Sequence, residues 1–119
     1  RVLVQNFMQL VELNAREQWR VADYARVMGI SSDRLTTAIR RATGQSPLEL
    51  VHWRLLQDAE SLLERSSLQV REIADALGFR DAGYFNRFFS RLKGMPPGRF
   101  RQQVRISSAR EPHSYAAWP

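Results

Sequence analysis

The feature that most constrains the fold is an internal repeat with a period near 50 residues. Both copies carry small, apolar, basic and turn-forming residues in the same order. The first parts align at an offset of 49, pairing Val21, Ala25 and Gly29 with Val70, Ala74 and Gly78. One extra residue then makes the offset 50, pairing Leu35, Ile39, Arg41, Gly44 and Pro47 with Phe85, Phe89, Arg91, Gly94 and Pro97. Because two copies are too few for a solenoid, the repeat predicts a tandem pair of small units.

Each copy predicts two helices joined by a tight turn. We expect short first helices over residues 21–28 and 70–77, and second helices that run to about residues 43 and 93. Gly29 or Gly78 follows each first helix and can adopt the positive φ that ends it. The residues suited to cap the second helices are Ser31, Ser32 and Asp81. This layout is a helix-turn-helix, in which a central alanine lets the second helix cross close above the first.

A long helix is predicted between the copies, over residues 46–66. Ser46 is a good N-cap, Pro47 suits the first helical position, and Glu49 completes a capping box. Its apolar stripe is Val51, Leu55, Ala59 and Leu62. A helix of about 20 residues spans roughly 30 Å, which is close to one turn of B-DNA, about 34 Å. Such a helix could hold two recognition helices about one turn apart.

The remaining elements complete an all-α fold of about seven helices. An amphipathic helix is expected over residues 3–14, and Phe100 and Val104 indicate a short last helix after Pro96 and Pro97. The predicted organisation is a first lobe (1–45), a linker helix (46–66), a second lobe (67–106) and a loose tail (107–119). Tyr115 and Trp118 in the tail could pack on the body or meet a partner. Trp19 and Trp53 are expected in the core or between the lobes.

The residue composition excludes several functions. The chain has no cysteine, which removes disulfides, thiol catalysis and cysteine-ligated zinc. His52 and His113 lack metal-ligand partners at suitable spacing, so we expect surface histidines and no metal. No nucleophile, base and orienter group appears, which predicts that the chain is not an enzyme and needs no cofactor. No apolar run approaches the roughly 18 residues of a membrane span. Since the chain begins at Arg1, we expect a fragment of a longer protein.

The charge is concentrated at one end of the chain. Residues 1–79 carry ten basic and ten acidic side chains, whereas residues 80–119 carry eight basic and two acidic ones, which is the whole net charge of +6. Seventeen of the eighteen cations are arginine, a side chain suited to bidentate recognition of phosphate or guanine. Genomic base composition also favours arginine, but it does not explain the asymmetry along the chain.

Two segments carry a resemblance to a known family. The pattern IADALGF…YFNRFF…KGMPPGRFR resembles the second helix-turn-helix signature of AraC/XylS-type bacterial transcription regulators, and LELVHWRLLQDAESLLERS resembles their linker helix. The resemblance runs from about Val2 to Gln103. It implies a homeodomain-like, double helix-turn-helix domain that binds promoter DNA in the bacterial cytoplasm, at the nucleoid. It also implies RNA polymerase as a partner, and an N-terminal sensing or dimerisation domain missing from this chain.

Within the second recognition helix the aromatic residues are expected to face the core. Phe85, Phe88, Phe89 and Leu92 share one side at helical spacing, and Phe79 and Phe100 can close over them. Proteins that stack bases on aromatic side chains expose them, whereas these repeat with an inward period. The basic residues lie on the other faces, so aromatic core and cationic surface share one segment.

The outward faces of the two recognition helices supply the candidate DNA contacts. On the first helix the face is Asp33, Thr36, Thr37 and Arg40, and an offset of 50 gives Gly83, Asn86, Arg87 and Ser90 on the second. The candidates for base edges are Asp33, Thr36, Thr37, Ala82, Gly83, Asn86 and Arg87. The candidates for phosphates are Ser32, Arg40, Arg41, Arg80, Ser90, Arg91 and Lys93. Gly83 and Ser90 depart from the family pattern, since Ser90 replaces a residue that is commonly basic.

Several alternatives stay open at the level of sequence. Asp33 could accept from a cytosine amino group or act as a helix N-terminal charge. Arg54 could reach DNA, although an ion pair with Asp58 four residues on is favoured. The chain could also be the DNA-binding part of a multidomain repair protein, such as an alkyltransferase with reactive cysteines elsewhere. A third reading is a protein-interaction or membrane-surface module.

Overall fold

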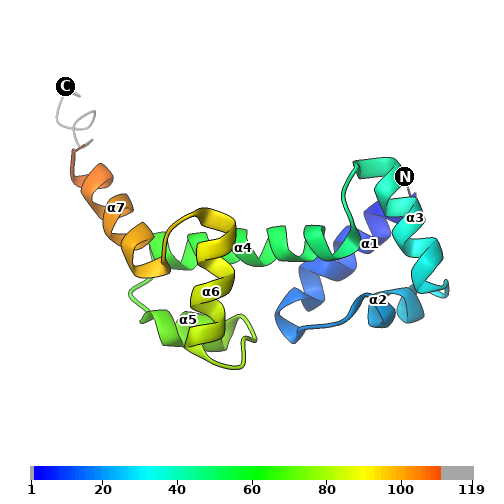
Figure 1. Ribbon diagram of the computed structural model, residues 1–119, viewed down its shortest axis with the longest axis horizontal. Helices are drawn as coiled ribbons and strands as arrows, with labels where there is room; N and C mark the ends of the chain where they lie inside the picture. The colour runs from blue at the N-terminus through cyan, green and yellow to red at the C-terminus, as the bar shows by residue number, and fades with distance from the viewer. Residues whose placement is uncertain (1, 111–119) are drawn as a thin grey trace, which may run out of the picture.

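One long helix forms the axis of the molecule, with a group of helices around each half of it (Figure 1). The computed structural model describes residues 2–110, in which all regular structure is helical. The elements are α1 (Val2–Asn14), the short 3₁₀ helix η1 (Ala15–Glu17), α2 (Val21–Met28), α3 (Ser32–Thr43), α4 (Pro47–Arg65), α5 (Val70–Ala76), α6 (Ala82–Lys93) and α7 (Pro97–Arg110). Helices α1 and α3 pack along one half of α4, with α2 against both of them, and α5 to α7 lie around the other half. The two predicted helix-turn-helix units are therefore present as α2–α3 and α5–α6.

The helix boundaries follow from the capping residues. Ser46 Oγ accepts from the Glu49 amide at 3.1 Å and the Glu49 carboxylate accepts from the Ser46 amide at 2.8 Å, which is the predicted capping box of α4. At the start of α5 one half of such a box is present, since the Glu72 carboxylate accepts from the Gln69 amide at 2.7 Å. Gly29 ends α2 in the left-handed conformation, with φ of 75°.

Both lobes pack against a single apolar stripe on α4. Its buried residues are Val51, Leu55, Ala59 and Leu63, one per turn. The stripe differs from the predicted one at its end, because a spacing of four residues continues to Leu63 and leaves Leu62 half-buried. Trp53 was expected in the core or between the lobes, but half of its surface is exposed (50%). Trp53 lies two residues after Val51, on the far side of the helix from the stripe.

The second lobe has an aromatic core, as predicted. Phe79, Phe85, Phe88, Phe89 and Phe100 are all buried, and neighbouring rings pack with centroids 5.0–6.0 Å apart. Such distances match the tilted and edge-to-face arrangements that aromatic rings prefer.

The prediction for Leu92 was wrong, because this side chain is 42% exposed. Ala42, at the equivalent position of α3, is exposed as well. In both units the core-facing stripe of the recognition helix ends at Ile39 or Phe89, one turn before the helix does. The final turn of each recognition helix therefore projects beyond the helices that cover its earlier turns.

Helix α7 is longer than the sequence pattern indicated. A short helix was expected to give way to a loose tail at residue 107, but α7 continues to Arg110. Exposed side chains dominate beyond Val104, so no apolar period marks the extension. Tyr115, Trp118 and His113 lie outside the described residues.

Arg101 joins α7 to the end of α4. Its guanidinium donates to four backbone carbonyl oxygens at 2.6–3.3 Å, those of Leu62, Leu63, Ser66 and Leu68. The last carbonyls of a helix have no partner within the helix, so this side chain caps α4 across the fold. Arg101 is thus part of the scaffold, although its charge adds to the basic end of the sequence.

We predict that Arg101→Ala lowers the free energy of unfolding by about 1–3 kcal/mol, since carbonyl acceptors at the end of α4 lose their donor. Urea unfolding followed by circular dichroism measures the change. Arg105→Ala is the matched control, because Arg105 is exposed on the same helix and its side chain makes no ion pair within residues 2–110. Equal loss in the two variants would contradict a capping role.

Candidate nucleic-acid interface

The two recognition helices, α3 and α6, are built in the same way. Ser31 Oγ accepts from the Arg34 amide at 3.1 Å, and Asp81 Oδ1 accepts from the Tyr84 amide at 2.7 Å. Gly44 and Gly94 end the helices, and their amides donate to carbonyls four residues back at 2.8 Å. The buried residues of each helix hold it on its lobe, so the opposite face is presented outward.

On α3 the predicted contact residues share one outward face. Asp33, Thr37, Arg40 and Arg41 are exposed, whereas Ser32 and Thr36 are half-buried. Within residues 2–110, neither Arg40 nor Arg41 is held in an ion pair. Both guanidinium groups are therefore available to an anionic ligand, and the threonine hydroxyls lie between them and the start of the helix.

On α6 the outward face is shaped by Arg87 and its neighbours. Arg87 is exposed, and a Cβ placed on Gly83 would lie 3.5 Å from its Nη1. Asn86 is half-buried and donates from Nδ2 to the Ala82 carbonyl at 3.1 Å. The Arg87 side chain therefore lies back along the helix, in van der Waals range of position 83. Ala82 and Ser90 are half-buried at the two ends of this face.

Tyr84 lies between two of the candidate contact residues and was not among the residues predicted from the sequence. Its ring is 44% exposed and lies under two guanidinium groups, that of Arg80 at 5.0 Å and that of Arg87 at 5.8 Å from the centroid. Such cation–π contacts orient arginine side chains without neutralising them. This contact could have been predicted from the sequence, because Arg87 follows Tyr84 by three residues, about one helical turn. It was masked by the many neighbouring aromatics that face inward.

Lys93 is less available than predicted for a phosphate. Its Nζ lies 3.0 Å from Glu60 Oε2 on α4 and 5.3 Å from the centroid of the Phe100 ring. Arg91, two residues earlier, lies over the Phe88 ring at 5.9 Å and has no ion pair in the described part of the chain. Lys93 is therefore already paired with a carboxylate, whereas Arg91 contacts only an aromatic ring.

His52 was expected on the surface, but it is half-buried and packs edge-to-face on Phe88 at 5.3 Å. Burial lowers the pKa of His52 below the ordinary value of 6.5, and the positive charge of Arg91 lowers it further. The imidazole is held neutral beside the cationic end of α6. Its neighbour Arg54 forms the predicted ion pair with Asp58, at 3.1 Å.

Other kinds of site find no support in residues 2–110. No group of three or more His, Asp or Glu side chains there could hold a metal ion. Nor does any helix in this range have both the length and the apolar run to cross a membrane.

A model of a helix-turn-helix domain family matches residues 24–103, about two thirds of the chain. The chain belongs to the AraC-type helix-turn-helix family. The family's domain is a DNA-binding domain of transcription regulators and is itself non-enzymatic. The match begins in α2 and ends in α7, so it includes both recognition helices and the whole of α4.

Three bacterial relatives show the extent of the similarity. The transcriptional activator RclR of Escherichia coli is 30% identical over 73% of this chain, and the MmsAB operon regulatory protein of Pseudomonas aeruginosa is 30% identical over 64%. The regulator ExsA of P. aeruginosa is 29% identical over 83% of this chain. The chain spans only 25–34% of the length of these three proteins.

Solved AraC-type structures share the fold. The DNA-binding domain of AdpA, solved in complex with a target DNA, is 28% identical and covers 93% of this chain and 96% of its own, with a TM-score of 0.78. The C-terminal domain of the response regulator yesN from Fusobacterium nucleatum has a TM-score of 0.80 at 20% identity, over 85% of this chain and 99% of its own. The second comparison shows the fold alone.

We predict that His52→Gln reduces the loss of stability on mild acidification. A group whose pKa is lowered in the folded state favours the unfolded state once it takes up a proton. The stability that depends on neutral His52 is therefore complete above pH 6.5 and is lost as the pH falls below it. Urea unfolding at pH 7.5 and pH 5.5 should show a smaller difference for the variant. Parallel losses in the two proteins would contradict the prediction.

Proposed function

We propose that this chain binds double-stranded DNA of a specific sequence and thereby regulates transcription, with α3 and α6 in successive major-groove segments. The observation that supports this most is the pair of identically capped recognition helices, each with an outward polar face, mounted on one 19-residue helix. At 1.5 Å per residue α4 is about 28 Å long, which suits two contacts about one turn of B-DNA apart. The resemblance to the AdpA domain adds support.

Sequence would be read by the outward faces. We assign Arg87 to guanine, since a free guanidinium held by a tyrosine face can donate twice to O6 and N7. Thr36 and Thr37 offer hydroxyl and methyl groups from α3, and Asn86 keeps its amide oxygen and a second N–H after bonding Ala82. The remaining base-edge candidates are Asp33, Ala82 and Gly83.

Phosphates would be bound by residues beside these faces. We assign Arg40, Arg41, Arg80 and Arg91, with Ser32 and Ser90 as hydroxyl donors. Lys93 takes a smaller part, because Glu60 already neutralises its charge. Such contacts fix the register of the protein on the duplex without reading its sequence.

The whole protein is proposed to be larger than this chain. Since the chain covers a quarter to a third of its relatives, we expect a further domain that senses a signal or forms dimers. Work at a promoter in the bacterial cytoplasm implies contact with RNA polymerase. Selection of bound sites from random duplexes tests the proposal. Equal binding of selected duplex, random duplex and RNA would exclude it.

We predict that Arg87→Ala costs about 1–3 kcal/mol of binding free energy at one base pair of the selected site, because a bidentate contact to guanine is lost. A scan of single base substitutions, measured with both proteins, locates that base pair. The substitution penalty there should vanish in the variant. Uniform weakening over all sequences would show that Arg87 contacts phosphate instead.

We predict that log K falls against log salt with a slope of about −4 to −7, as expected for roughly five to eight neutralised phosphates. Arg91→Ala should make the slope less steep by about one contact. Lys93→Ala should change it less, since that ammonium is paired with Glu60 in the free protein. Fluorescence anisotropy over a range of salt gives the slopes. A larger effect at Lys93 than at Arg91 would reverse the assignment.

A further inference from the structure

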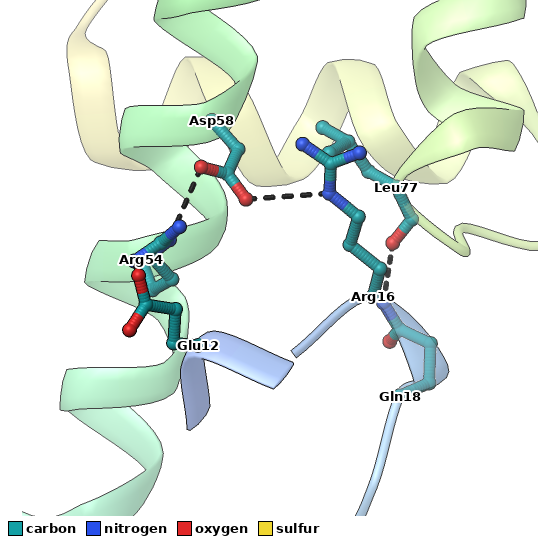
Figure 2. Close-up of polar contacts among 6 residues, drawn as sticks. All are labelled: Glu12, Arg16, Gln18, Arg54, Asp58 and Leu77. Carbon is teal, nitrogen blue, oxygen red and sulfur yellow. Dashed lines mark hydrogen bonds and ion pairs between the residues drawn. The ribbon is translucent and has the colours of Figure 1, made fainter. Parts of the chain in front are cut away.

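The two lobes touch each other directly, beside the helix that joins them (Figure 2). The segment from Ala15 to Gln18, which ends the first helix of the first lobe, lies against the turn that follows α5 in the second. Gln18 Nε2 donates to the Leu77 carbonyl at 3.2 Å. Gln18 itself has a left-handed backbone, with φ of 59°, and no other non-glycine residue in 2–110 has a positive φ. Its unusual conformation directs the chain into this contact.

Gly78 brings the two backbones together. A Cβ placed on Gly78 would collide with the carbonyl oxygen of Arg16 and lie 3.0 Å from the carbonyl carbon. Real Cβ atoms are not found so close to backbone, and backbone cannot swing away as a flexible side chain can. Glycine is therefore required here by the neighbouring lobe, in addition to its φ of 85°.

The repeat supplies a position for comparison. Gly29 occupies the same place in the first unit, with φ of 75°, but a Cβ placed on it would meet nothing within 4 Å. The two glycines share the need for a left-handed backbone and differ in what surrounds them. Only Gly78, in the second unit, faces the backbone of the other lobe.

An ion-pair chain reinforces the contact. Asp58 on α4 accepts from Arg16 of the first lobe at 3.3 Å and from Arg54 at 3.1 Å, and its side chain is only 16% exposed. Arg54 also lies 3.8 Å from Glu12 on α1. These side chains link α1 and η1 to the middle of α4, next to the point where Gln18 reaches Leu77.

We infer that this interlobe clamp, made of Arg16, Gln18, Leu77, Gly78 and Asp58, sets the separation and the rotational phase of the two DNA half-sites that the protein accepts. The inference rests on the proposed function. Both lobes pack on α4, so without a further contact their relative placement would depend on the stiffness of that one helix. A second contact between the lobes restrains bending and twisting of α4, so the spacing between half-sites becomes part of the specificity. Each base pair inserted would turn one half-site by roughly 35° about the duplex axis.

The test measures affinity for a selected site whose spacer between half-sites is shortened or lengthened by one or two base pairs. The natural chain should bind the selected spacing about tenfold or more tightly than the altered ones, since altered sites prevent simultaneous engagement. Gly78→Ala should reduce that ratio to about threefold or less, mostly by weakening the selected spacing. Gly29→Ala, which carries the same backbone penalty, should keep the ratio of the natural chain.

Arg16→Ala is a second variant that leaves both turns intact. It should also reduce the ratio, by less than Gly78→Ala because the ion pair is partly exposed. Its control is Arg26→Ala, which breaks an ion pair of 2.8 Å within the first lobe and should not alter the ratio.

The outcomes separate this inference from the proposed function. Should the natural chain bind selected and random duplexes equally, the proposed function fails. The inference about the clamp is contradicted, while the proposed function stands, if the natural chain prefers the selected duplex but binds every spacing with equal affinity. It also fails if Gly78→Ala and Gly29→Ala, or Arg16→Ala and Arg26→Ala, give the same ratio.

Discussion

Burial of one apolar stripe on α4 is the interaction on which the rest of the structure depends. Within residues 2–110 neither lobe has more than three further α-helices, and such small groups bury too little apolar surface to be stable alone. Val51, Leu55, Ala59 and Leu63 belong to one buried apolar cluster that includes residues of both lobes. Each lobe therefore forms only by closing on the shared helix. The arrangement is elongated as a result, with a radius of gyration of 17.4 Å against about 13 Å for a compact domain of 100 residues.

Aromatic and cationic residues share α6 because its two sides face different surroundings. Three phenylalanines lie inward, and the arginines lie at the edges and on the outer side. At the edges the two kinds of side chain meet, as Arg91 over Phe88 and Lys93 over Phe100 show. The same rings that stabilise the lobe thereby help to hold cations in place at its surface. On α3 the buried residues are Leu35 and Ile39, which offer no aromatic face to a cation.

Local signals in the sequence predicted most of the fold. Caps such as Ser46 with Glu49 involve neighbours three residues apart, and the glycine turns recur in both copies, so helix limits and the helix-turn-helix layout could be inferred. The inward phenylalanines followed from helical spacing. Leu92 could not be predicted, because its exposure depends on where the covering helices stop. The exposure of Trp53 follows from its helical phase, because it lies two residues after Val51 and so on the opposite side of α4 from the buried stripe.

Contacts distant in sequence account for the features of the candidate site that were not foreseen. Lys93 pairs with Glu60, 33 residues away, and Arg101 caps a helix that ended 36 residues earlier. Nothing in the local pattern distinguishes these cations from Arg91. The extension of α7 to Arg110 was missed for a different reason, since helix-forming residues without an apolar period give no packing signal. The outward placement of the α3 residues, in contrast, could be predicted from the helical period alone.

The unequal surroundings of Gly29 and Gly78 give the two turns different mutational tolerance. Asparagine also adopts the left-handed backbone, so a chain that drifts in sequence can exchange Gly29 for it with little disturbance. At Gly78 every side chain, asparagine included, brings a Cβ into the carbonyl of Arg16. The two turns, although alike in backbone conformation, are thus not equivalent. The first tolerates any residue that can adopt a left-handed backbone, whereas the second admits only a residue without a Cβ.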